Sequence, residues 1–249
     1  MNALGVVGYH HSGKTSIVTA LIKALSERSL RLASIKDIHS EKYRADTPGK
    51  NSALHIEAGS LQTFARGLQD TALIFPTQLA LGEMIPYLTA DFLIIEGMKD
   101  AAVPKIVCAA STSELDELLD DSTIAIGGLI SEQLQSYQGI RIFNFQRDID
   151  DLVSQVLTKT FPILPMSDPE CCSRCGSNCV QMAKDIVQGR RKREECILDS
   201  QKRIVLEVAG KEISIVPFVQ DILRDSILAI LKNLKDTDTE RDIHIHIKA

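Results

Sequence analysis

Apolar and polar positions along residues 1–160 predict strands and helices in turn. Short apolar runs of strand length occur at residues 3–7, 30–35, 71–75 and 91–96. Apolar residues recur at helical spacing at residues 17–25, 52–58, 77–88, 113–119 and 148–157. Strands that alternate with helices are typical of an α/β fold with a mostly parallel, doubly wound sheet.

The pattern changes after residue 160. Segment 161–169 contains three prolines, which interrupt regular structure. Beyond it we predict a cysteine-rich stretch at 171–196, a hairpin of 203–208 and 212–216 turning at Ala209-Gly210, a helix at 218–234 and a strand at 242–247. We therefore expect an α/β domain of residues 1–160 and a small, cysteine-rich α+β domain of residues 161–249.

The most specific motif lies between the first predicted strand and the first predicted helix. Residues 8–15, GYHHSGKT, match the phosphate-loop pattern G-x-x-x-x-G-K-[ST] and predict a P-loop NTPase. Backbone N–H groups of such a loop and the start of its helix bind a β-phosphate. Lys14 is expected to reach the β- and γ-phosphates, and Thr15 to ligate magnesium. The residues expected to bind nucleotide here are Gly8, Ser12, Gly13, Lys14, Thr15 and Ser16.

A carboxylate ends the apolar run at 91–96. In a parallel sheet Glu96 would emerge at the carboxyl end of its strand, beside the phosphate loop. There it would hold magnesium through water or orient the attacking water. Lys14 and Glu96 are thus the expected catalytic residues, while a helix-capping or loop role is the alternative for Glu96. Asp91, at the opposite end of the sheet, is expected to be structural.

The composition of the chain argues against several classes of protein. The chain has 249 residues, is 44% hydrophobic and carries a formal charge of −5, without the basic surface that nucleic-acid binding requires. No apolar run approaches the roughly 18 residues of a membrane span, and the N-terminus does not resemble a signal peptide. Six cysteines without an export signal indicate metal or redox chemistry. We expect a cytoplasmic protein with no membrane partner.

Several further motifs resemble the family of molybdopterin-guanine dinucleotide biosynthesis protein B (MobB). They are Lys36 and His39, DTPGKNS at 46–52, Ala58-Gly59, EGMK at 96–99 and PKI at 104–106. The resemblance covers residues 1 to about 160. It implies a GTP-binding accessory protein. Residues 46–52 form a polar loop with a Pro-Gly turn that is expected to close over the γ-phosphate, with Lys50 as the sensing residue; a solvated surface turn is the alternative. The chain departs from the family at Asn51, where aspartate is usual.

The same resemblance implies a pathway and partners. The pathway is synthesis of the guanine dinucleotide form of the molybdenum or tungsten cofactor. The partners are the molybdopterin guanylyltransferase or molybdopterin itself, and a second copy in a homodimer. Because the loop offers no arginine finger, we expect slow GTPase activity. No N-K-x-D motif is present, and the nearest comparable region, 123–131, has no acidic residue to bind guanine, so guanine is implied by resemblance alone.

The cysteines form a second constellation. Three thiolates on a short loop and a distant fourth are typical of a cubane iron–sulfur cluster. The stretch is similar to the 4Fe-4S modules of certain electron-transfer and carbon monoxide dehydrogenase subunits, with a helix at 180–188 and Gly189 before the last cysteine. Zinc is the alternative metal. The expected ligands are Cys172, Cys175, Cys179 and Cys196, with Cys171 as a substitute for Cys172. Cys108 is expected to be a core thiol.

Two other classes of function stay open. A nucleotide-dependent metallochaperone would insert a metal centre into a target enzyme and carry it on the cysteines. A redox or electron-transfer module would use the cysteines and retain the phosphate loop only as a vestigial clamp.

Overall fold

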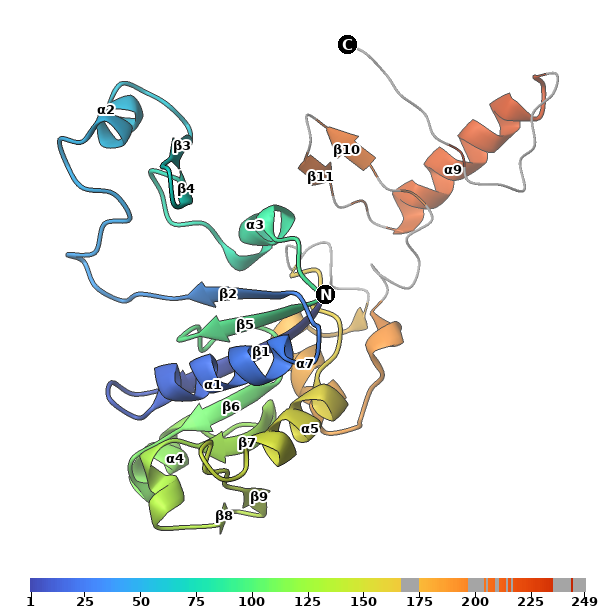
Figure 1. Ribbon diagram of the computed structural model, residues 1–249. Coiled ribbons are helices and arrows are strands. Elements are labelled where there is room, and N and C mark those ends of the chain that lie inside the picture. The colour runs from blue at the N-terminus through green and yellow to red at the C-terminus, as the bar shows by residue number, and fades with distance from the viewer. Residues whose placement is uncertain are drawn as a thin grey trace.

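The computed structural model describes residues 1–166, 175–196, 204, 206–208, 211–213, 215, 217–234 and 243. A five-stranded parallel sheet lies at its centre, in the order β2-β5-β1-β6-β7 (Figure 1). This confirms the predicted α/β fold with a mostly parallel sheet. The strands are β1 Asn2–Gly8, β2 Leu32–Lys36, β5 Phe92–Glu96, β6 Lys105–Cys108 and β7 Thr123–Gly127.

Both faces of the sheet are covered, which explains why the central strands are continuous apolar runs. On one face, α1 (Lys14–Ser26) and α5 (Ile149–Lys159) pack their buried residues against Leu4 and Ile94. On the other face, α4 (Thr112–Leu118) buries Leu115 against β6 and β7. The sheet therefore has a helical layer on each side, as a doubly wound fold requires.

Two strands of the sheet, β6 and β7, were absent from the sequence prediction. They are four and five residues long and fully buried. Such short apolar runs carry no alternation that separates strand from helix or loop. The helix predicted at 77–88 is also shorter than expected. It consists of α3 (Leu81–Met84) and a 3-10 turn at Ile85–Tyr87, where Pro86 lies at the start of the turn.

The strand predicted at 71–75 forms, but outside the parallel sheet. It is β4 (Thr71–Ile74), paired antiparallel with β3 (Thr63–Arg66). The Gly67 N–H donates to the Asp70 carbonyl at 2.9 Å, and so tight a connection permits only antiparallel pairing. With α2 (Asn51–Glu57), this hairpin forms an arm that follows β2 and precedes β5 in the sequence and lies beyond the β2 edge of the sheet (Figure 1).

The chain after α5 returns to the amino ends of the strands. The Ala3 N–H donates to the Phe161 carbonyl at 3.4 Å, and Pro162 bridges Asn2. Helix α7 (Cys179–Val187) buries Met182 and Ala183 in an apolar cluster that also contains Phe161. Residues 161–166 thus pack against the α/β domain, and the division into two domains stays a prediction.

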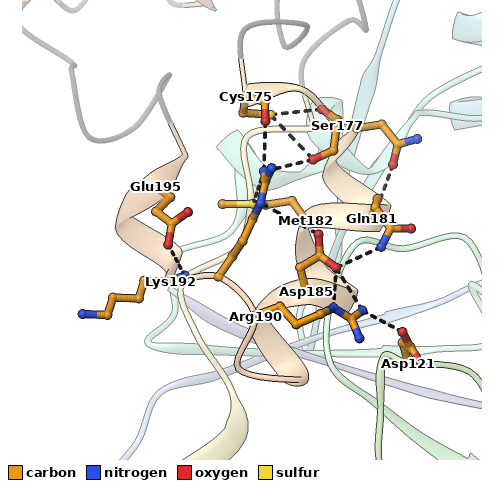
Figure 2. Close-up of polar contacts among 11 residues, drawn as sticks. Asp121, Cys175, Ser177, Gln181, Met182, Asp185, Arg190, Lys192 and Glu195 are labelled. Carbon is orange, nitrogen blue, oxygen red and sulfur yellow. Dashed lines mark hydrogen bonds and ion pairs between the residues drawn. The ribbon is translucent and has the colours of Figure 1, made fainter.

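Ion pairs accompany this packing. Arg190 binds Asp121 at 2.6 Å and Asp185 at 2.9 Å, and Lys184 binds Asp120 at 3.0 Å. Figure 2 shows Arg190 between the two carboxylates. Asp120 and Asp121 lie before β7, with one residue between Asp121 and the start of the strand, so α7 is tied to the same end of the sheet as Phe161.

A short antiparallel hairpin of β8 (Ser136–Tyr137) and β9 (Ile140–Arg141) was not predicted. The described elements near the C-terminus agree with the prediction. Strands β10 (Leu206–Val208) and β11 (Lys211–Ile213) form the expected antiparallel hairpin, and α9 spans Pro217–Leu231. The strand predicted at 242–247 lies outside the described residues, except for Ile243. Within the described ranges, we find no helix with the length and apolar composition needed to cross a bilayer.

Candidate nucleotide-binding site

The phosphate-loop motif joins β1 to α1, as predicted. At Gly8 a Cβ atom would lie 2.2 Å from the Cys108 carbonyl oxygen and 2.6 Å from Ser12 Oγ, so only glycine fits. Gly13 adopts a left-handed conformation (φ 94°) immediately before α1. The first N–H groups of a helix have no intrahelical partner. The loop therefore directs backbone donors into the space above α1, where a phosphate would lie.

A turn from a distant part of the chain supports this loop. The Leu129 N–H donates to the Ser12 carbonyl at 3.3 Å. A Cβ at Gly128 would approach that same carbonyl oxygen to 2.2 Å, and a Cβ at Gly13 would lie 3.2 Å from the Gly128 Cα. The turns after β1 and β7 are thus in backbone contact at the carboxyl end of the sheet. Sequence reasoning missed this role, for which the Gly127-Gly128 pair was the available signal.

Thr15 and Glu96 meet beside the loop, as predicted. The Thr15 hydroxyl donates to Glu96 Oε1 at 2.7 Å, and the residue Glu96 is only 6% exposed. Lys36 Nζ lies 3.2 Å from the same oxygen, because Lys36 and Glu96 are register partners on β2 and β5. A hydroxyl and a carboxylate are hard oxygen donors that suit magnesium, so this pair fits the predicted ion. Lys36 supplies the buried carboxylate with a counter-charge.

These residues line one cavity of about 730 Å³. Every residue predicted to bind nucleotide contributes to it except Lys50, which lies in the arm immediately before α2. The contact of Lys50 with the γ-phosphate therefore stays a prediction. Lys14 Nζ donates to the Tyr9 carbonyl at the cavity wall. The other lining residues are Tyr9, His10, His11, Lys36, Asp37, Ile38, His39, Ser40, Gly97, Lys99 and Leu129.

Tyr9 and Lys99 are site residues that sequence reasoning did not single out. The Tyr9 hydroxyl donates to Glu117 of α4, a hydrogen bond that raises the pKa of Tyr9. Lys99 Nζ lies 4.6 Å from the centroid of the Tyr9 ring, within cation–π range. The side chain of the first variable residue of the loop is thereby directed away from the phosphate position and toward α4. Lys99 follows Glu96 by three residues, which was the signal for its place at the cavity.

The structure describes three of the predicted cysteine ligands. Cys171 and Cys172 lie outside the described residues. Cys196 is buried, and Cys179 packs against the same apolar cluster. Cys175 Sγ donates to the Ser177 carbonyl at 3.0 Å, and Arg191 Nη1 donates to the Cys175 carbonyl at 3.0 Å (Figure 2). Among the described residues, no group of three or more His, Cys, Asp or Glu side chains is placed to hold a metal ion.

Cys108 matches its prediction as a core thiol. It is fully buried in β6, and burial raises its pKa to about 12. A thiol in this state is neutral at physiological pH and unreactive.

Comparison with known proteins links the chain that carries this site to one family. The family model described as "Molybdopterin guanine dinucleotide synthesis protein B" matches residues 3–131. A relative from Methanocaldococcus jannaschii is 28% identical over 254 residues, covering 99% of this chain and 97% of the relative. A relative from Bacillus subtilis is 32% identical over 143 residues, covering 56% of this chain and 83% of the relative. Both carry the provisional name of molybdopterin-guanine dinucleotide biosynthesis adapter protein.

The fold leads to the same family. The crystal structure of Bacillus subtilis MobB superimposes with a TM-score of 0.53 at 30% sequence identity, and the match covers 62% of this chain and 98% of that one. The phosphate loop, the Thr15–Glu96 pair and the supporting turn after β7 all lie within the residues matched by the family model. The chain belongs to the MobB family.

Proposed function

We propose that the chain is a GTP-binding adapter protein with slow GTPase activity in synthesis of the guanine dinucleotide form of the molybdenum or tungsten cofactor. The observation that carries the proposal is the Thr15–Glu96 pair beside the phosphate loop, in a cavity of about 730 Å³. The names of the two relatives support the pathway.

Each residue has a role that follows from its position. The N–H groups of residues 12–15 bind the β-phosphate, and Lys14 exchanges the Tyr9 carbonyl for phosphate oxygens. Magnesium, when bound, neutralises charge that develops on the phosphates, and Thr15 and Glu96 would hold it. Lys36 keeps the Glu96 carboxylate paired and oriented in its buried position.

The composition of the cavity supports slow turnover. In the part of the chain that the structure describes, the cations that line the cavity are lysines, with histidines beside them and no arginine. An arginine finger raises phosphoryl-transfer rates by about 10³- to 10⁵-fold. A site without one suits a protein that signals its nucleotide state to a partner.

The arm supports interaction with other proteins. Leu61, Phe64 and Leu68 are 86%, 68% and 103% exposed. Apolar side chains gathered on one projecting element are typical of protein–protein contacts. We assign the arm to contact with the guanylyltransferase or with a second copy of the chain in a homodimer.

A 4Fe-4S cluster held by Cys175, Cys179, Cys196 and either Cys172 or Cys171 is part of the proposal. Its support is that Cys179 and Cys196 contact one apolar cluster although they are far apart in sequence. Zinc is the alternative occupant. If the cysteines instead carry cargo for a target enzyme, the chain is a metallochaperone, and nucleotide hydrolysis would release the metal.

The decisive experiment combines binding with pathway activity. Titration calorimetry with GTP and magnesium is expected to show binding that Lys14→Ala weakens by about 100-fold or more, since the variant lacks the charge-assisted phosphate contacts. The wild-type chain should increase dinucleotide formation by the guanylyltransferase, and Lys14→Ala should not. A Lys14→Ala variant that stimulates the transferase as well as the wild type would overturn the proposal.

A further inference from the structure

The residues around the phosphate loop explain binding of phosphate but not the choice of base. A second cavity, of about 530 Å³, opens beside the turn that follows β7. Leu129 lines the phosphate cavity and Ser131, two residues later, lines the second one. One short turn, the 3-10 helix Leu129–Glu132, therefore connects the two spaces.

Both walls of the second cavity stand at the carboxyl end of the sheet. Ser131 follows β7, while Asn144, Arg147 and Asp148 follow Ile142, which bridges Ile126 in parallel. Ligands of open parallel sheets bind outside the carboxyl ends of the strands. The backbone contact of Leu129 with Ser12 fixes the first wall relative to the phosphate loop. A nucleotide with its phosphates in that loop has this turn beside it.

Asn144, which lines the second cavity, forms a polar pair with Glu132, the last residue of the 3-10 helix. Asn144 is 5% exposed, and its Nδ2 donates to Glu132 Oε1 at 2.5 Å. Asn144 is itself fixed, because its Oδ1 accepts the Gln146 N–H and its own N–H donates to Asp148, each at 3.0 Å. Glu132 is exposed and has no ion pair among the described residues. The structure thus holds an accessible carboxylate in a set orientation.

A carboxylate at this position can accept hydrogen bonds from guanine but not from adenine. Guanine presents two adjacent donors, N1–H and N2–H₂, which a carboxylate accepts together. At the corresponding two positions adenine presents an unprotonated N1 and a C2–H, so a carboxylate placed there finds no donor. Leu129, 54% exposed, offers an apolar surface for the face of the ring. Glu132 immediately follows the region in which sequence inspection found no acidic residue.

We propose that Glu132, positioned by Asn144, recognises the guanine base and makes this chain selective for GTP over ATP. The inference rests on the proposed nucleotide binding at the phosphate loop and adds the residue that reads the base.

The test is affinity for four nucleotides, measured by titration calorimetry on the full chain with magnesium. GTP, ITP, ATP and XTP are compared for the wild type, Glu132→Gln, Asn144→Ala and the charge-matched control Glu27→Gln. ITP lacks the N2 amino group and should bind about 10-fold more weakly than GTP to the wild type. Glu132→Gln should lower GTP affinity by about 10- to 100-fold and leave ATP affinity unchanged.

An increase in XTP affinity would show that residue 132 contacts the base itself. Xanthine has a carbonyl where guanine has the N2 amino group, so the amide of Glu132→Gln should improve XTP affinity while Glu27→Gln should not. Asn144→Ala should lower selectivity for GTP less than Glu132→Gln does. If Glu132→Gln keeps the wild-type ratio of GTP to ATP affinity, the inference is wrong and the proposed function stands. If the wild type binds no nucleotide, the proposed function fails and the inference falls with it.

Discussion

At the scale of single residues, Gly8 is a position where sterics exclude any side chain. A Cβ there would overlap the Cys108 carbonyl, whereas Gly49 has a left-handed φ of 78° but no atom within 4 Å of the added Cβ. Gly49→Ala should therefore lower the free energy of unfolding by about 1 kcal/mol, from backbone strain alone. Gly8→Ala should lower it by about 2–4 kcal/mol, because a core strand must shift as well. Urea denaturation measures both, and equal losses would contradict the steric argument.

Lys36 gives a second prediction at this scale. Its ammonium group lies 3.2 Å from a carboxylate that is 8% exposed. Lys36→Met removes the ammonium group that pairs with the Glu96 carboxylate and orients it for magnesium, so GTP hydrolysis should slow by about 10- to 100-fold. GTP affinity should change much less. Phosphate release measures the rate, with Lys36→Arg as the rescue and exposed Lys42→Met as the control. A Lys36→Met rate equal to that of the control would exclude this role for Lys36.

At the scale of elements, an ion pair connects the starts of β2 and β5. Asp91 and Arg31 precede β5 and β2, and the Arg31 guanidinium binds Asp91 at 2.7 Å. Hydrogen bonds from the Arg31 side chain and backbone lower the pKa of Asp91 from 3.8 to about 2. A carboxyl with a lowered folded-state pKa stabilises the fold above its unfolded pKa and loses that contribution as pH falls. Thermal unfolding between pH 5 and pH 2 should therefore depend less on pH in Asp91→Asn than in the wild type.

The attachment of α7 allows packing to be compared with ion pairing. Met182 is 2% exposed in the apolar cluster, whereas the Arg190 side chain is 48% exposed. Exposed ion pairs contribute about 0–1 kcal/mol, and truncation of a buried methionine costs about 2–5 kcal/mol. We expect Met182→Ala to lower the free energy of unfolding more than Arg190→Ala does. The reverse order in urea denaturation would mean that the ion-pair network dominates.

These elements also show what the sequence predicts and what it does not. The phosphate loop was predictable because its glycines, lysine and threonine are local requirements within eight residues. The β10–β11 hairpin was predictable for the same reason. The contact between Lys36 and Glu96 depends on strand register, and the contact between Gly128 and Ser12 on strand order. Neither register nor order is encoded in the local pattern. Strands β6 and β7 were missed because short, fully buried runs have no periodicity to read.

At the scale of the whole molecule, the cysteine prediction can be tested against the nucleotide site. Anaerobically purified chain is expected to contain about four irons and four sulfides, the content of one cubane cluster. A Cys175→Ser Cys179→Ser variant should lose both and keep its GTP affinity, because Cys179 and Cys196 pack with Phe161 near the amino ends of the strands, whereas the phosphate loop follows the carboxyl end of β1. Iron, sulfide and zinc analysis measures the content. Zinc at one per chain without sulfide would exclude the cluster.

Strand β1 connects these two ends. It runs from Asn2, which bridges Pro162, to Gly8, where the phosphate loop begins. Seven residues of parallel strand span about 20 Å. A ligand held near Cys179 and Cys196 and a nucleotide in the phosphate loop would therefore lie too far apart to touch each other. The length of β1 thus sets the distance between the two ends of the domain.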